Sequence, residues 1–148
     1  MALQEKTSQE IITRLQVMKT SMDAYFMVDD LSHLQRGGRL SGTQALIGGL
    51  LQVKPLLHFE NKVIVPFEKV RTRKKAMKRI VELLQEAVKG GEPFQASIIH
   101  ANREQEALAW KAELQDQFPT VEFHISYFGA VIGTHLGEGS MGLTWVKK

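Results

Sequence analysis

Two short glycine motifs contain the residue types best suited to binding an anion. The first glycine motif is Arg36-Gly37-Gly38-Arg39-Leu40-Ser41. Its glycines allow a tight turn and a close approach of the backbone to a ligand, Arg39 supplies a permanent forked cation, and Ser41 offers a hydroxyl beside a helix start. This pattern suits a carboxylate or a phosphate. It is also typical of one helix ending and another beginning beside solvated arginines, so both interpretations stay open.

The second glycine motif is Gly133-Thr134-His135-Leu136-Gly137-Glu138-Gly139. Its three glycines remove side-chain cover and leave the Thr134 hydroxyl and the His135 imidazole as the uncharged donors. Imidazole changes its charge near neutral pH, so His135 suits donation to a carboxylate or a phosphate. We interpret residues 129–142 as a glycine-rich loop that carries this donor. A structural turn with a hydrogen-bonded histidine is the alternative.

Several kinds of site chemistry are not predicted. The sequence has no cysteine, and no second His, Asp or Glu lies at metal-ligand spacing from His135. The glycine spacing fails the dinucleotide-binding and Walker patterns, and no Gly-x-Ser-x-Gly nucleophile elbow occurs. From these residues we predict no metal, no cofactor and no catalytic residue.

A basic segment gives the chain its positive charge. Seven of the 19 basic residues fall between residues 69 and 79, while the remaining 12 face 16 acidic residues elsewhere. Arg73, Lys74 and Lys75 lie in the first turn of a predicted helix, where the helix dipole disfavours cations. We interpret this segment as a surface for an acidic partner, with a solvated helix face as the alternative. Nucleic acid is not favoured, because no aromatic residues interleave with the cations.

The elements that would position these motifs follow from periodicity, capping residues and turn signals. The predicted helices span residues 7–22, 31–36, 41–52, 72–88 and 102–118. The predicted strands span residues 25–28, 56–59, 62–70, 97–100, 121–127 and 143–146. The strand, helix, strand order over residues 97–127 is normally parallel and right-handed. We expect an α/β fold, in which a single compact domain has a mixed β-sheet with helices packed on it.

Particular residues fix several of these boundaries. Thr7 and Glu10 are expected to form a capping box at the first helix, Thr72 to cap the helix of the basic segment, and Asn102 to cap the next helix. Pro66 indicates that the second strand of the predicted hairpin lies at a sheet edge or bends at this residue.

Length and composition agree with one domain. The chain has 148 residues, of which 43% are hydrophobic and 24% are charged. No stretch approaches the roughly 18 uninterrupted apolar residues of a membrane span, and no secretory signal precedes the first helix. We expect a soluble, cytoplasmic protein.

Four stretches together resemble a known family. They are residues 34–41 (LQRGGRLS), 50–57 (LLQVKPLL), 69–72 (KVRT) and 132–139 (IGTHLGEG). In this order they resemble the C-terminal domain of the DegV family of bacterial fatty-acid-binding proteins, over about residues 30–142.

The resemblance implies a function and roles for individual residues. Proteins of this family are expected to bury a fatty acid between two domains, with a Thr/Ser pair of the N-terminal domain and a histidine of the C-terminal domain holding the carboxylate. His135 would be that histidine, with Thr134 and Ser41 beside it and Arg39 as the nearby cation. Some members present the carboxylate to a separate fatty acid kinase, which makes an acyl phosphate. Arg71 would belong to the kinase-facing surface, extended by three neighbours, Arg73, Lys74 and Lys75.

The resemblance also implies a missing part. Residues 1–148 would correspond to the C-terminal domain only, because the chain opens directly on the predicted helix at 7–22. We therefore expect weak binding of a long-chain fatty acid by this chain alone, and an exposed apolar face near residues 46–51 that promotes self-association. Two alternatives remain, namely a stand-alone module for small anions and an enzyme acting on a phosphorylated metabolite.

Overall fold

The structure is a computed structural model and describes residues 6–38 and 54–148. Its centre is a six-stranded mixed sheet in the order β3-β2-β1-β6-β4-β5. The strands are β1 (Asp23–Met27), β2 (Lys54–Glu60), β3 (Val63–Val70), β4 (Phe94–His100), β5 (Val121–Tyr127) and β6 (Met141–Lys147). The predicted α/β class with a mixed sheet is confirmed.

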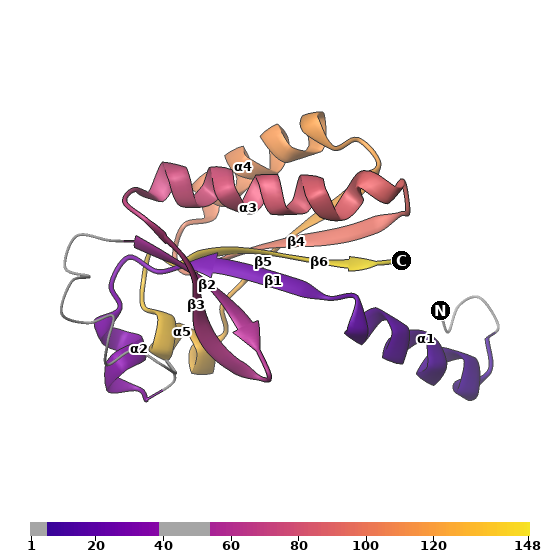
Figure 1. The fold of residues 1–148 in the computed structure, drawn as a ribbon, viewed down its shortest axis with the longest axis horizontal. Helices are drawn as coiled ribbons and strands as arrows, with labels where there is room; N and C mark the ends of the chain where they lie inside the picture. The colour runs from indigo at the N-terminus through magenta and orange to yellow at the C-terminus, as the bar shows by residue number, and fades with distance from the viewer. Residues whose placement is uncertain (1–5, 39–53) are drawn as a thin grey trace.

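Helices lie on both faces of this sheet (Figure 1). They are α1 (Ser8–Thr20), α2 (Ser32–Arg36), α3 (Arg73–Ala87) with the short 3₁₀ turn η3 (Val88–Gly90), α4 (Glu104–Gln117) and α5 (Ala130–Leu136). Helices α3 and α4 cover one face, whereas α2 and α5 lie on the other (Figure 1). The predicted helix over residues 41–52 falls outside the described residues, as does the expected apolar face near 46–51.

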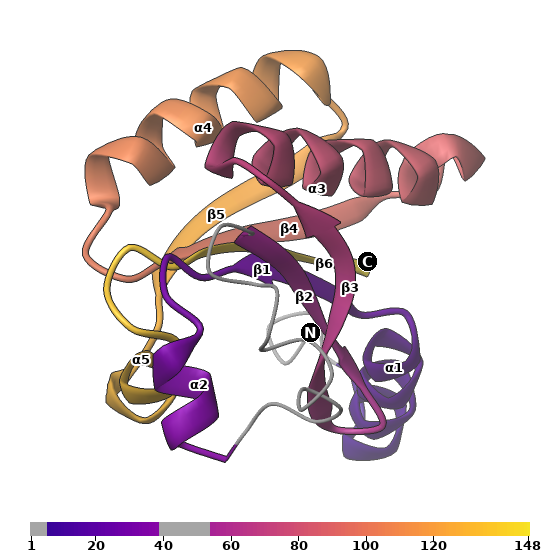
Figure 2. The ribbon, with the colours of Figure 1, turned by 60° about the vertical axis from the view of Figure 1, so that its left-hand side comes forward.

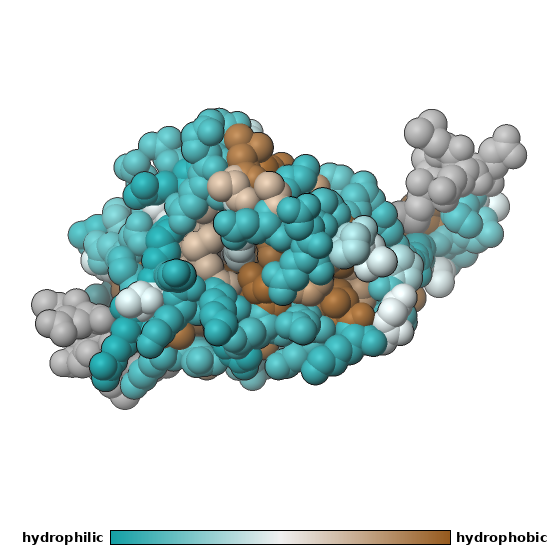
Figure 3. Space-filling model, turned by 90° about the horizontal axis from the view of Figure 1, so that it is seen from above, coloured by the Kyte–Doolittle hydropathy of each residue, from teal (hydrophilic) through white to brown (hydrophobic). Residues whose placement is uncertain are grey.

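The larger hydrophobic core lies between the sheet and the α3/α4 layer. Ala76, Ile80 and Leu84 recur every four residues along α3 and are fully buried, which is the stripe expected of a helix packed on a sheet. Ala107, Trp110 and Leu114 of α4 belong to the same core. The outer surface of this layer is mostly hydrophilic, with hydrophobic residues gathered in the middle of the face (Figure 3).

A smaller core lies on the opposite face. Successive residues of a strand point to opposite faces, so Met27 joins the larger core while Phe26 and Val28 join the smaller one. Leu34 of α2 and Leu136 of α5 complete this second core and are buried. The two short helices that carry the glycine motifs are therefore held to the sheet by one apolar side chain each.

Strand pairing agrees with the predictions made from turns and proline. Strands β4 and β5 pair in parallel, and β2 and β3 form an antiparallel hairpin. Asn61 and Lys62 in its turn have φ of 50° and 68°, the left-handed pair that tight hairpins require. Pro66 lies on the edge strand β3, opposite Leu57 where the register shifts.

Helix α1 is correctly predicted, yet it buries no residue. The Thr7–Glu10 capping box is present, with the Thr7 N–H donating to Glu10 Oε2 over 2.7 Å. The helix extends away from the sheet (Figure 1), and Ile12, Leu15 and Val17 are each about half exposed. Within the part of the chain described by the structure, its apolar side chains have no core to enter.

Two predictions of local structure are wrong. The expected glycine-rich loop contains helix α5, in which the N–H groups of Gly133 and Gly137 donate to carbonyls four residues earlier. Burial of Leu136 offsets the helix-weakening effect of the glycines. Asn102 does not cap α4. It has a φ of 55° and donates through Nδ2 to Glu138 Oε1 over 2.8 Å.

Candidate functional site

The two glycine motifs meet at one edge of the sheet, which we call the site edge. Strands β1, β4 and β5 end there and β2 and β6 begin there, as the pairing of Met27 with Leu56 and Met141 shows. Helix α2 follows β1, and α5 follows β5, so both short helices lie side by side at this edge (Figure 2). The sheet thus joins two sequence motifs that are far apart along the chain.

His135 and Gly37 form the contact that joins the motifs. A Cβ atom on Gly37 would overlap with Nδ1 of His135 and would lie 3.0 Å from Cε1. Gly37 has φ of −75° and ψ of −7°, a conformation open to any residue. Proximity of the imidazole, not backbone strain, therefore requires glycine at this position.

The predicted convergence of His135 and Arg39 is not tested by the structure. His135 lies against the backbone of the first glycine motif, in the last turn of α5. Arg39 and Ser41 of the same motif lie outside the described residues. Their predicted roles remain predictions.

A second histidine, His33, forms the reciprocal contact. A Cβ atom on Gly137 would lie 2.7 Å from Cδ2 of His33, and Gly137 has a φ of 79°. The sequence analysis gave His33 no role. The position of His33 one helical turn before Gly37 is the signal that could have identified it. The Gly37 N–H donates to the His33 carbonyl over 2.9 Å.

Helix α5 carries polar and apolar side chains together. The Thr134 hydroxyl donates to the Ala130 carbonyl over 2.7 Å, so its oxygen is left only as an acceptor for a ligand. Val131 and Ile132 are 75% and 41% exposed. Val131 precedes His135 by four residues and so shares its side of the helix. The surface around the imidazole is therefore partly apolar.

Arg73, predicted to face a partner, lies inward at the site edge. Its Nε and Nη2 donate to the two Glu106 carboxylate oxygens over 2.8 and 2.9 Å, and its side chain is 23% exposed. Nη1 donates to Asp29 Oδ1 over 3.3 Å. Two carboxylates thus compensate for a cation at the start of α3. The unfavourable interaction of this cation with the helix dipole is offset by tertiary contacts.

The other predicted partner-binding residues differ from Arg73. Arg71, Lys74 and Lys75 are exposed, and within residues 6–38 and 54–148 they form no ion pair. Thr72 caps the helix between them, its side chain accepting from the Lys75 N–H over 3.2 Å. These three cations form a solvent-facing basic surface near the site edge.

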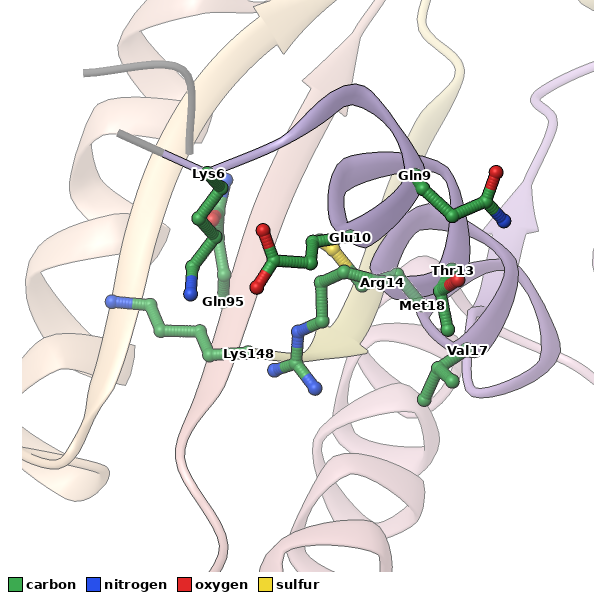
Figure 4. A pocket seen from close by; sticks show the side chains of 9 residues that line it. All are labelled: Lys6, Gln9, Glu10, Thr13, Arg14, Val17, Met18, Gln95 and Lys148. Atoms are coloured by element: carbon green, nitrogen blue, oxygen red, sulfur yellow. The ribbon is translucent and has the colours of Figure 1, made fainter. Parts of the chain in front are cut away.

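A groove of about 920 Å³ lies at the opposite edge of the sheet. It is lined by α1 and by Gln95 and Lys148, which mark the start of β4 and the residue after β6. Lys6, Arg14 and Lys148 converge on it with Glu10 between them (Figure 4). Hydrogen bonds from Thr7 lower the pKa of the Glu10 carboxyl. This groove is separate from the contact between His135 and Gly37.

The described residues contain neither a candidate metal site nor a helix that could span a membrane. No group of three or more His, Asp or Glu side chains there could hold a metal ion. No helix among the same residues is long and apolar enough to cross a membrane.

Comparison with known proteins gives a consistent result. The family model described as "Uncharacterised protein, DegV family" matches residues 1–148. The Protein DegV of Bacillus subtilis is 64% identical over 140 residues, which are 95% of this chain and 50% of that protein. This chain spans about half the length of the curated relatives it matches.

Solved structures show the same fold. The structure of DegV from Bacillus subtilis, described as a fatty acid binding protein, has a TM-score of 0.85 and 63% identity and covers 96% of this chain and 50% of its own. A fatty acid binding DegV family protein from Streptococcus agalactiae has a TM-score of 0.86 and 36% identity, covering 99% of this chain and 52% of its own.

Proposed function

The chain belongs to the DegV family, and from this premise we propose that it is one lobe of a two-lobed protein that binds a long-chain fatty acid. Residues 1–148 would form the C-terminal lobe. Two observations support the proposal. Similar proteins of known structure are described as fatty acid binding, and the matched relatives are about twice as long as this chain.

The contact between His135 and Gly37 carries the assignment of the site. A fatty acid needs a hydrogen-bond donor for its carboxylate and an apolar surface for its chain. The Nδ1 side of the His135 ring faces Gly37, so we assign Nε2 as the donor to the carboxylate. Val131 and Ile132 provide exposed apolar surface on the same helix.

Further residues of the two motifs complete the proposed site. We assign Arg39 as the cation near the carboxylate, with Ser41 beside it, on the basis of their place in the first glycine motif. Thr134 contributes an acceptor only, because its hydroxyl donates within α5. The roles of these residues are positioning and charge neutralisation, not covalent chemistry.

One lobe alone should hold the ligand weakly. Burying a carboxylate that keeps only part of its hydrogen bonds costs several kcal/mol. The other lobe would supply the remaining donors. We therefore propose that full affinity requires both lobes.

The exposed basic surface suggests a protein partner. We propose that Arg71, Lys74 and Lys75 dock a fatty acid kinase to which the carboxylate is presented, so that this protein is a carrier and the kinase performs the chemistry. Arg73 is left out of this surface because its guanidinium is engaged by Glu106 and Asp29. Docking through exposed charges should weaken as salt rises.

A titration with oleate, followed by NMR of histidine-labelled chain, tests the binding proposal. We expect the imidazole resonances of His135 to move and those of His124, a partly exposed histidine on β5, to stay. His135→Gln should weaken oleate binding measured by calorimetry, and His124→Gln should leave that binding intact. Oleate binding that leaves His135 unmoved would refute the site. A stoichiometric fatty acid co-purified with this chain would refute the need for a second lobe.

The docking proposal has its own test. Arg71→Ala should weaken association with a fatty acid kinase more at low salt than at high salt, while Lys19→Ala on α1 should change nothing. Equal kinase affinity for the wild type and Arg71→Ala would exclude this surface.

A further inference from the structure

Arg73 connects four separate elements at the site edge. Besides its paired hydrogen bonds to Glu106 of α4 and its contact with Asp29 after β1, Nη1 donates to the Gly139 carbonyl over 2.6 Å. Gly139 lies in the segment between α5 and β6. One guanidinium from the start of α3 therefore holds α4, the end of β1 and the α5–β6 segment together.

The chemistry of this junction requires arginine. Two nitrogens form the fork to one carboxylate, and the third reaches a backbone carbonyl on the far side, which a lysine ammonium does not reproduce in planar geometry. The side chain is 23% exposed, so its hydrogen bonds are partly shielded from water. Asp29 also forms an ion pair with Lys54, whose Nζ lies 3.2 Å from Oδ1.

The segment held by Arg73 is closely packed. Gly139 has a φ of 84°, and a Cβ atom there would overlap with the Asp29 carboxylate. Its N–H donates to the Ala101 carbonyl over 2.9 Å, and the Ala101 N–H donates to the Ser140 carbonyl over 2.9 Å. The segment is thus fixed on one side by β4 and on the other by Arg73 and Asp29.

Ser140 links this segment to the end of α5 by hydrogen bonds. Its side chain is fully buried, and its hydroxyl lies 2.9 Å from the carbonyl oxygens of both Leu136 and Gly137. Those two carbonyls follow His135 directly. A shift of the segment would therefore move the last turn of α5, in which His135 packs on Gly37.

We propose that Arg73 is a positioning residue for His135, acting through Gly139 and Ser140. The proposal rests on the fatty-acid site proposed above, because it concerns the placement of the same imidazole. It gives Arg73 a role other than contact with a partner. Arg73 itself does not touch the ligand.

The same helix offers a matched control. Arg79 is also an α3 arginine of similar exposure, 28%, and its Nε donates to Glu68 over 2.9 Å. It makes ion pairs with Glu82 and Glu86 but has no contact with the α5–β6 segment among the interactions of the described residues. Arg79→Gln therefore removes a comparable ion-pair network without affecting the path to His135.

The experiment compares Arg73→Gln with Arg79→Gln in the ligand-free chain. We expect Arg73→Gln to shift the His135 imidazole resonances and to speed hydrogen exchange at the Gly139 N–H, and Arg79→Gln to leave both as in the wild type. Arg73→Lys should lie between. In an oleate titration followed at the His135 resonances, Arg73→Gln should raise the apparent dissociation constant roughly tenfold. Unchanged His135 resonances and exchange in Arg73→Gln would overturn the proposal.

A second pair of variants and the oleate titration distinguish the possible outcomes. If Arg73→Gln does not fold, Glu106→Gln removes the partner of the fork, and it should still shift His135 more than Glu68→Gln does. If oleate leaves the wild-type His135 unmoved while Arg73→Gln shifts it without ligand, the fatty-acid site fails and the positioning role stands. A kinase-affinity loss in Arg73→Gln with an unaltered His135 would instead identify Arg73 as a partner contact and refute positioning.

Discussion

The imidazole of His135 occupies the space that a side chain on Gly37 would need. This contact joins two glycine motifs that are distant in the sequence, and it depends on α2 and α5 following the ends of β1 and β5 at the same edge of the sheet. Glycine at position 37 is therefore explained by a tertiary contact. The same relationship makes the placement of the imidazole open to simple tests.

Gly37→Ala should displace His135 while leaving the fold nearly as stable. The backbone at Gly37 is already helical, so alanine reduces unfolded-state entropy and offsets part of the cost of the overlap. We expect a net change in unfolding free energy below about 1 kcal/mol in urea titrations, together with a large shift of the His135 imidazole resonances. Gly129→Ala, where a Cβ meets nothing within 4 Å, should cause no such shift. Unmoved His135 resonances in Gly37→Ala would disprove the contact.

Gly139→Ala should destabilise the protein more than Gly91→Ala does. Both glycines have left-handed φ angles, of 84° and 73°, so each substitution carries a backbone cost of about 1–2 kcal/mol. At Gly91 the added methyl group meets nothing within 4 Å, whereas at Gly139 it overlaps with Asp29. We expect a further loss of about 1–3 kcal/mol at Gly139. Equal chemical-denaturation midpoints for the two variants would contradict the close packing of this segment.

Leu15→Ala should have almost no effect on the stability of this chain. Leu15 lies on α1 and is 49% exposed, whereas Leu84 on α3 is fully buried. We expect a change within about 0.5 kcal/mol for Leu15→Ala and a loss of about 2–5 kcal/mol for Leu84→Ala. Thermal or urea unfolding of both variants provides the measurement. A large loss in Leu15→Ala would mean that α1 packs against the domain in solution.

Acidification should loosen the start of α2 through Asp30. The Ser32 hydroxyl and the Ser32 N–H both donate to this carboxylate and hold its pKa below the usual 3.8, the hydroxyl having the larger effect. A carboxyl with a lowered folded-state pKa stabilises the fold above its usual pKa, and that contribution disappears as pH falls through the lowered value. We expect the Ser32 amide resonance to titrate below pH 3.8. Asp30→Asn should remove this titration, and its persistence in that variant would assign it to another group.

Elements that depend on near neighbours could be predicted from the sequence alone. The Thr7–Glu10 capping box, the Thr72 cap and the buried stripe of α3 each involve residues within about one helical turn or a few turns of one another. The parallel pairing of β4 and β5 also followed from the order of elements, since two strands joined by a crossover helix normally pair in parallel. These features together determined the α/β class.

Elements whose energy comes from distant residues could not be predicted in this way. Helix α5 contains the second glycine motif and has weak intrinsic propensity, and it forms because Leu136 reaches a core shared with β1 and α2. Likewise, the charge pattern placed Arg73 among free surface cations. Carboxylates at Asp29 and Glu106, which are remote in the sequence, turn it inward.

The residue types available for an anion site can be read from the chain alone: they are the glycines, the imidazole of His135 and the cations. The tertiary structure decided which of them meet. Glycine is permissive whatever surrounds it, so its sequence position does not reveal which neighbour needs the space. Only the arrangement of strand ends at one sheet edge places His135 on Gly37 and joins Arg73 to Gly139.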